Sequence, residues 1–309
     1  MVTIINYRER YESDAESLNP EMTREIRSLR DVVKDSVCVA LCDGEFVGFG
    51  FLADANPYRV SAGEDKVRYL RAEFAVISGI EEEAEASVTL LEELMYRFDR
   101  LRCDDGRKPV MRVWVKAEET AYTELLFDEG FRVGNVMTVM TRPIDEDDWV
   151  SCGDVEIREF FDSAEEWDQY FSVNARSFGE PDSENEMRFR LKNPDAHVWV
   201  AIADDTLVAA VSTWPVRGGV YATENIFCDP EYRRRGITTK LLTYVLGRLH
   251  EAGASEARLT VYGDNLPAIR LYRKLGYSVA YELLEMHYFG REEAREERMA
   301  EEPDERDWR

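Results

Sequence analysis

Apolar and polar positions follow the same order twice along this chain. Residues 39–48 form an apolar run, an Asp-Gly turn and a second apolar run, which predicts two strands joined by a tight turn. Residues 200–209 repeat the pattern around Asp204-Asp205. Glu73-Phe74 precedes Glu224-Asn225 by 151 residues, and residues 125–131 precede the similar residues 271–277 by 146. The sequence therefore predicts one fold present in two copies.

Within each half, the periodicity predicts a strand, a helix, two hairpin strands, and then strand, helix, strand, helix and strand. In the second half, residues 239–251 have helical spacing, residues 258–262 are β-rich, and residues 267–275 form a helix that ends before Gly276. The predicted class is mixed α/β, with two tandem domains, each a mostly antiparallel central sheet flanked by helices. The expected parts are a first domain (1–143), an acidic linker (144–153), a second domain (154–289) and a charged tail (290–309).

Composition narrows the expected setting. A length of 309 residues suits two domains. The absence of an apolar run of about 20 residues and of a secretory signal pattern predicts a cytoplasmic protein that does not enter a membrane. Five cysteines without a C-x-x-C pair argue against a disulfide framework or a zinc site, so no metal is expected.

The net charge of −24 disfavours nucleic acid and anionic membranes as partners. Seven of the 39 basic residues are lysine, a composition that fits either a salt-adapted cytoplasm or general solubility. The sequence leaves the oligomeric state open.

One basic turn stands out against this acidity. An apolar run, Ile226-Phe227-Cys228, leads to the turn Arg233-Arg234-Arg235-Gly236, and a helical pattern follows at Ile237-Thr238-Thr239. Free backbone N–H groups and the helix dipole favour an anion at a helix N-terminus. The turn therefore predicts a site for a phosphate-bearing cofactor.

Two motifs carry a resemblance to a known family. Residues 233–238, Arg-Arg-Arg-Gly-Ile-Thr, resemble the Arg/Gln-x-x-Gly-x-Gly/Ala pyrophosphate loop of the GNAT acyl-CoA-dependent N-acetyltransferases. Residues 265–277 resemble the second GNAT signature, Asn-x-x-Ala-x-x-Leu-Tyr-x-Lys-x-Gly-Phe/Tyr, about 30 residues further on. The likeness is close over residues 154–288 and holds in outline over 3–142. It implies transfer of the acetyl group of acetyl-CoA to a primary amine, of a small molecule or a peptide, by direct attack.

The resemblance also implies which residues bind the cofactor. Backbone N–H groups of the basic loop would hold the pyrophosphate, while its arginine side chains would steer or pair with the phosphates. Thr238 departs from the usual Gly or Ala. Asn265 would hold the cofactor or simply cap its helix. The expected cofactor-binding residues are Ile226, Phe227, Cys228, Arg233, Arg234, Arg235, Gly236, Ile237, Thr238, Thr239 and Asn265.

Acyl transfer to an amine needs a base for the ammonium proton and an acid for the departing thiolate. By resemblance, Tyr272 is the expected acid and Glu224 the candidate base. Glu73 occupies the position of Glu224 in the first half, so a purely structural role for Glu224 stays open. Cys228 could be an acyl-carrying nucleophile, but without a histidine partner in the sequence pattern it is interpreted as a packing residue.

The first half has lost the corresponding positions. Glu82-Glu83-Ala84-Glu85 stands opposite the arginine turn, Glu119 opposite Asn265, and Leu126 opposite Tyr272. Carboxylates would repel a phosphate, so the first half is expected to be a degenerate GNAT domain and the second half the active one. Two alternatives remain open. One is a non-catalytic acyl-CoA-binding sensor or scaffold, and the other is a ribosomal or histone-like protein acetyltransferase whose acidic surface suits a basic acceptor.

Overall fold

The structure, a computed structural model, describes residues 1–28, 32–33, 35–54, 67–101, 107–145, 155–179, 187–188 and 190–291. The expected linker from residue 146 onward and the expected tail beyond residue 291 lie outside these residues. No helix in the described ranges is long and apolar enough to cross a membrane.

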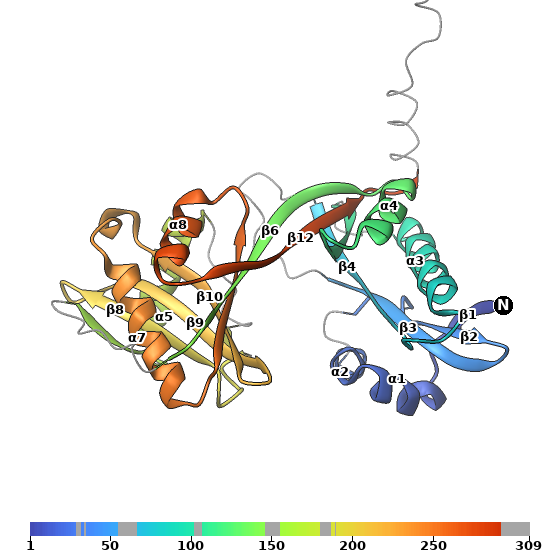
Figure 1. Ribbon diagram of the computed structural model, residues 1–309, viewed down its shortest axis with the longest axis horizontal. Coiled ribbons are helices and arrows are strands. Elements are labelled where there is room, and N and C mark those ends of the chain that lie inside the picture. The colour runs from blue at the N-terminus through green and yellow to red at the C-terminus, as the bar shows by residue number, and fades with distance from the viewer. Residues whose placement is uncertain are drawn as a thin grey trace, which may run out of the picture.

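The six strands and the two helices that follow the fourth and fifth strands come in the same order in both halves, among the described residues (Figure 1). The first half consists of β1 (Val2–Asn6), η1 (Glu9–Tyr11), α1 (Glu12–Leu18), α2 (Pro20–Ser28), β2 (Cys38–Cys42), β3 (Glu45–Asp54), β4 (Val67–Val76), α3 (Glu83–Asp99), β5 (Lys108–Lys116), α4 (Thr120–Asp128) and β6 (Arg132–Pro143). The second half consists of β7 (Glu156–Glu159), α5 (Ala164–Phe178), β8 (His197–Ala203), β9 (Thr206–Arg217), β10 (Val220–Cys228), η3 (Pro230–Tyr232), α7 (Ile237–Glu251), β11 (Glu256–Tyr262), α8 (Leu266–Lys274) and β12 (Ser278–Tyr288). The predicted mixed α/β class with flanking helices is confirmed.

The predicted tight turns are also present, and their residues explain them. The β2–β3 turn has Asp43 at φ 50° and Gly44 at φ 90°, and the β8–β9 turn has Asp204 at φ 51° and Asp205 at φ 57°. Two consecutive residues with positive φ are typical of the hairpin turns that match the twist of antiparallel strands. Asp and Gly tolerate this backbone conformation better than most residues.

The halves exchange their last strands. Among the described residues, twelve strands form one sheet in the order β1-β2-β3-β4-β5-β12-β6-β11-β10-β9-β8-β7. Strand β12 pairs with β5 of the first half, with Glu285 opposite Trp114, and β6 pairs with β11 of the second half, with Val139 opposite Thr260. Figure 1 shows β6 and β12 as an arch that joins two lobes. The sheet is therefore continuous, although the sequence predicted a separate sheet in each half.

Each hydrophobic core includes residues from the other half's last strand. The first-half core under α3 and α4 contains Met286 and Tyr288 of β12. The second-half core under α7 and α8 contains Met140 of β6. Smaller clusters lie on the opposite face of the sheet, under α1 and α2 and under α5. The two halves consequently depend on one another for both strand pairing and packing.

We expect the halves not to fold separately. A fragment of residues 155–291 would expose β11 as an unpaired edge and leave β12 without both of its neighbours, so it should show no cooperative thermal transition by circular dichroism. Production together with residues 1–145 should restore the transition. A cooperative, monomeric fragment 155–291 would contradict the importance of the strand exchange.

Candidate active site

The second half has an opening in its sheet where β10 and β11 separate. These parallel strands pair only from Val220–Ala222 and Glu256–Arg258. Beyond Ala222, β10 continues beside β9 alone, and its register shifts between Glu224 and Phe227. Asn225 lies in this bulge with φ 50°, a conformation that asparagine tolerates better than most residues. The backbone of Ile226 therefore faces a gap that an extended ligand arm can enter.

The N-terminus of α7 follows this gap directly and has free donors. Gly236 is the N-cap residue at φ 78°, and no side chain caps the helix among the described residues. The first N–H groups of a helix have no acceptor within the helix, so Ile237, Thr238 and Thr239 present donors there. A nest-like turn that leads into an uncapped helix N-terminus can bind a pyrophosphate. The geometry thus fits the phosphates of coenzyme A.

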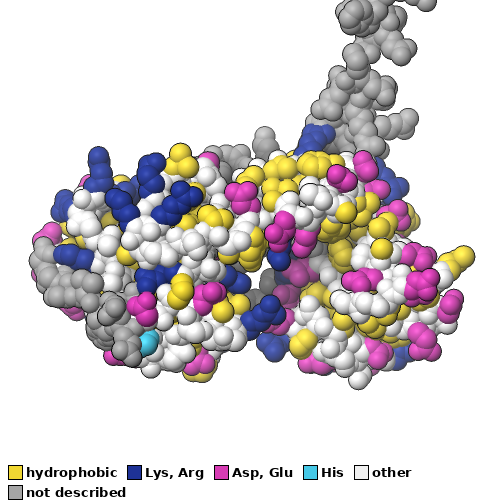
Figure 2. Space-filling model, in the orientation of Figure 1, with side chains coloured by type: hydrophobic (Ala, Val, Ile, Leu, Met, Phe, Trp, Pro, Cys, Tyr) yellow, Lys and Arg dark blue, Asp and Glu magenta, His cyan; other side chains and the backbone are white. Residues whose placement is uncertain are grey.

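Two of the three arginines shape the loop itself. The Arg233 Nε donates to the carbonyl of Cys228 at 3.1 Å, and the Arg235 guanidinium donates to the carbonyl of Glu231 at 3.0 Å. Arg234 is exposed and has φ 62°, so its backbone turns the loop. Among the described residues no partner of its side chain is present, which leaves Arg234 as the arginine best suited to meet a phosphate. Figure 2 shows Lys and Arg side chains over this lobe and Asp and Glu side chains over the other.

A salt bridge holds the base of the loop to α5. Arg176 donates to Asp229 Oδ2 at 2.6 Å, and Asp229 Oδ1 accepts from the N–H of Glu231 at 3.0 Å. Burial of the Asp229 carboxylate opposes its ionisation, but these hydrogen bonds hold its pKa below the usual value. The ionised Asp229 fixes the point where β10 turns into the loop.

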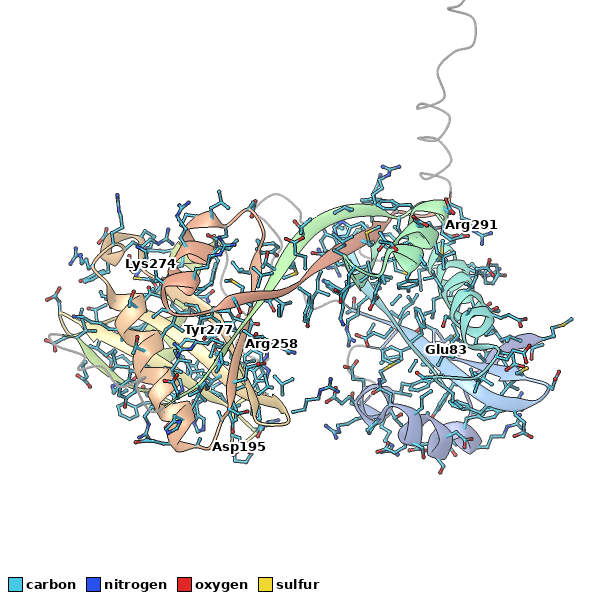
Figure 3. All side chains as sticks on the ribbon, viewed as in Figure 1. Glu83, Asp195, Arg258, Lys274, Tyr277 and Arg291 are labelled. Carbon is cyan, nitrogen blue, oxygen red and sulfur yellow. The ribbon has the colours of Figure 1, made fainter. Side chains whose placement is uncertain are left out.

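Helix α8 carries the second pair of expected residues. Asn265 caps this helix, since its Oδ1 accepts from the N–H of Ala268 at 3.3 Å. Tyr272 is buried in the same cluster as Cys228 and Ile237, and its ring lies 6.0 Å from that of Tyr277. The Tyr277 hydroxyl lies 3.2 Å from Thr223 Oγ1 on β10 and ties this helix to the open strand. Figure 3 shows Tyr277 beneath α8.

Glu224 lies on the opposite face of the sheet from Tyr272. Burial raises the pKa of Glu224 to about 7, although hydrogen bonds from the hydroxyl and N–H of Thr260 and the charges of Arg258 and Arg190 act against the shift. Its first-half counterpart, Glu73, instead forms an ion pair with Arg71. The two equivalent glutamates therefore have different environments, and a carboxylate with a pKa near 7 is suited to proton transfer.

Cys228 has the properties of a packing residue. It is buried in the second-half core, and burial raises the pKa of its thiol. Its carbonyl already accepts from two side chains, Ser177 Oγ at 3.2 Å and Arg233 Nε at 3.1 Å. A thiol with a raised pKa is a poor nucleophile. The groups of β10 that remain for a ligand arm therefore belong mainly to Ile226 and its neighbours.

The first half has the corresponding gap but fills it. Strand β4 pairs with β5 only up to Arg71, as in the second half, yet its register with β3 runs without a shift. Phe74 and Tyr122, which stand opposite Asn225 and Ala268 of the repeat, meet there with ring centroids 6.3 Å apart. The remaining pocket of about 500 Å³ is lined by Phe74, Ile80, Glu81, Glu83, Ala84, Ser87 and Tyr122. Two large rings and two carboxylates in the phosphate position do not fit coenzyme A.

Several residues at this opening were not predicted from the sequence. Four of them surround Glu224 on the α5 face of the sheet, namely Arg190, Ser212, Arg258 and Thr260. The bulge at Asn225 was also missed. The sequence Glu224-Asn225 before an apolar strand end could have indicated the bulge, since asparagine tolerates positive φ better than most residues. No local signal marked the others, which come from three different elements.

The sequence of the second half is similar to a known family of proteins. Residues 163–277 match the model of the Acetyltransferase (GNAT) family. The second half of this chain carries a GNAT domain. The match includes the basic loop, α7, Asn265, Tyr272 and Tyr277.

Two relatives are similar to part of this chain. A mycothiol acetyltransferase of Brachybacterium faecium is 30% identical over 134 residues, 39% of this chain and 40% of its own length. The ribosomal protein bS18-alanine N-acetyltransferase of Escherichia coli is 33% identical over 73 residues, 24% of this chain and 48% of its own length. The chain thus spans less than half the length of these relatives.

A solved structure is similar over nearly the whole chain. The tandem GNAT protein from the clavulanic acid biosynthesis pathway superposes with a TM-score of 0.63 at 14% identity, over 93% of this chain and 98% of its own. At this identity the likeness concerns the fold alone. The fold of this chain, including the part outside residues 163–277, is therefore similar to that of a tandem GNAT protein.

Proposed function

We propose that this chain is an N-acetyltransferase that transfers the acetyl group of acetyl-CoA to a primary amine, with its active site in the second half. The observation that carries the proposal is that a strand gap, a helix N-terminus, a carboxylate and a tyrosine come together at one opening of the sheet. A bulged strand separates from its neighbour, an uncapped helix N-terminus follows, and a carboxylate with a raised pKa lies on one face opposite a buried tyrosine on the other.

The residues of the chain suit direct transfer. The basic loop would bind the pyrophosphate, and the free β10 edge at Ile226 would hold the pantetheine arm and polarise the thioester carbonyl. An amine that approaches from the α5 face meets Glu224, which would accept its proton. Tyr272, on the α7–α8 face, would donate a proton to the departing thiolate. The placement of base and acid on opposite faces matches the opposite directions of attack and departure.

The acceptor would be a small-molecule or peptide amine. The relatives include proteins named for mycothiol and for a ribosomal-protein alanine, so both kinds occur among similar sequences. Acetyl-CoA bound without turnover on a broad amine panel would instead support a sensor or scaffold.

The pH dependence of activity tests the role of Glu224. Because the raised pKa of about 7 must be passed before the carboxylate can accept a proton, kcat/KM should rise with pH through about 7 and then level off. The variant Glu224→Gln should lose most of the activity and this inflection while keeping affinity for acetyl-CoA. An unchanged inflection in Glu224→Gln would remove Glu224 from the mechanism.

The same shift has a consequence for stability. The folded state holds the Glu224 proton more tightly than the unfolded chain, whose carboxylate has a pKa near the ordinary 4.5. The contribution of this group to the free energy of unfolding is therefore fully present below about pH 4.5 and is lost as the pH rises to about 7. Glu224→Gln should remove this part of the pH dependence.

A further inference from the structure

The internal repeat gives Arg258 a direct counterpart in the first half. The offset of 146 residues that relates residues 125–131 to 271–277 also relates Arg112 on β5 to Arg258 on β11. The strand pairing agrees, since Arg112 stands opposite Arg71 of β4 and Arg258 opposite Ala222 of β10, positions related by the offset of 151. The two arginines occupy the same place beside the two gaps.

Arg112 has a carboxylate partner and an aromatic partner within the protein. Its Nε lies 2.8 Å from Glu285 Oε1, and its guanidinium lies over the ring of Tyr69 at 3.3 Å. The Glu285 carboxylate also meets His287 at 2.9 Å and the Asn135 amide at 3.0 Å. Burial of Glu285 favours its neutral form, but these partners hold its pKa below the usual value, so it is an anion.

Arg258 has neither partner. The same offsets place Val139 where Glu285 stands and Val220 where Tyr69 stands, and the pairing of Val139 with Thr260 matches that of Glu285 with Trp114. Arg258 is half-buried, and no carboxylate among the described residues lies within ion-pair distance of it, including Glu256 on the same strand. A half-buried guanidinium without a directly paired carboxylate is costly, and the described part of the chain provides such a pair in the first half only. Glu224 acts on Arg258 from beyond ion-pair distance.

The surroundings of Arg258 are those of the proposed acceptor face. Its charge acts on Glu224, as does that of Arg190, which lies over the Trp214 ring at 4.7 Å. The hydroxyl of Ser212, opposite Glu224 on β9, is buried and has no hydrogen-bond partner among the described residues. Figure 3 places Arg258 at the edge of the second lobe that faces the first, and Figure 2 shows a hollow between the lobes.

We propose that Arg258 binds an anionic group of the acceptor, so that the substrates of this enzyme are small amines that also carry a carboxylate or a phosphate. The anion takes the position relative to Arg258 that the Glu285 carboxylate takes relative to Arg112. The amine then lies toward Glu224 and the opening of the sheet. This inference rests on the proposed function and adds the chemical class of the acceptor. It also differs from the alternative, left open by the sequence, that the acidic surface suits a basic acceptor.

The test compares matched amines with the full-length protein. β-Alanine and phosphoethanolamine are set against their uncharged counterparts β-alaninamide and ethanolamine, with spermidine as a cationic acceptor, and thiol release is followed. The wild type should prefer the anionic members. Arg258→Met should raise KM for these by about 10- to 100-fold, because a charged hydrogen-bond partner is lost, and should change KM for the neutral members far less. All rates are compared at a pH well above the pKa of Glu224, because the charge of Arg258 also lowers that pKa. Arg248→Met, which removes an exposed charge from the same half, should change neither.

A second variant imitates the first half. Val139→Glu would place a carboxylate opposite Thr260, two residues along β11 from Arg258, as Glu285 stands relative to Arg112. It should weaken binding of anionic acceptors as Arg258→Met does, with the acetyl-CoA Kd measured first to verify an intact cofactor site. A wild type that binds acetyl-CoA but prefers neutral or cationic amines, or uses none of the anionic ones, would overturn this inference. So would an equal effect of Arg258→Met on all members. Failure to bind acetyl-CoA would instead overturn the proposed function.

Discussion

Replacement of Gly236 by glutamate is expected to weaken acetyl-CoA binding by at least about 100-fold. Gly236 has φ 78°, so any side chain at this position is strained, and a carboxylate there would face the phosphates at the N-terminus of α7. The substitution imitates the first half, where glutamates occupy the corresponding turn. Isothermal titration with acetyl-CoA measures the effect directly.

Gly253 provides the matched control at the other end of the same helix. It has φ 81°, and, as at Gly236, no atom lies within 4 Å of where a Cβ would be. Gly253→Glu therefore carries the same strain and the same added charge, but far from the proposed phosphate site. Its acetyl-CoA affinity should equal that of the wild type. A similar loss in both variants would mean that Gly236→Glu acts through stability.

The variant Tyr272→Phe is expected to lower kcat by about 100-fold or more while it leaves the Kd for acetyl-CoA unchanged. Tyr272 is buried beside the last residue of β10 and the first of α7, so its ring packs in the core whether or not the hydroxyl is present. The variant removes the hydroxyl that would supply the proton for the departing thiolate. Steady-state thiol release and equilibrium titration separate these two effects.

Tyr277→Phe is the control for this substitution. Its hydroxyl meets Thr223, and its ring lies next to Tyr272, so the variant removes a neighbouring phenol with a structural partner. We expect a loss of about 1 kcal/mol in stability and little change in kcat. Full turnover in Tyr272→Phe would exclude this tyrosine as the acid.

Local patterns in the sequence sufficed to predict the repeated elements. The hairpin turns follow from Asp43-Gly44 and Asp204-Asp205, which accept positive φ, and Gly236 marks the start of α7 for the same reason. The cap of α8 follows from Asn265, which the sequence left undecided between a cap and a cofactor contact. Its cofactor role, like those of the other loop residues, stays a prediction. These features depend on backbone conformations that individual residue types favour.

The strand exchange could not be predicted in this way. Strands β6 and β12 occupy equivalent places in the repeat and have similar apolar patterns, so each could pair with either half. The choice depends on contacts between residues more than 140 positions apart, such as Val139 with Thr260. The absence of an ion-pair partner for Arg258 among the described residues could not be predicted from the sequence either. It depends on which residue of β6 lies beside Arg258.

The central claim is that the chain carries the GNAT fold twice but has one cofactor site, in the second half. Isothermal titration of the full-length chain with acetyl-CoA tests it most directly through the number of sites. The account predicts one site per chain, lost in Gly236→Glu. Two sites per chain, or one site that survives Gly236→Glu, would contradict it.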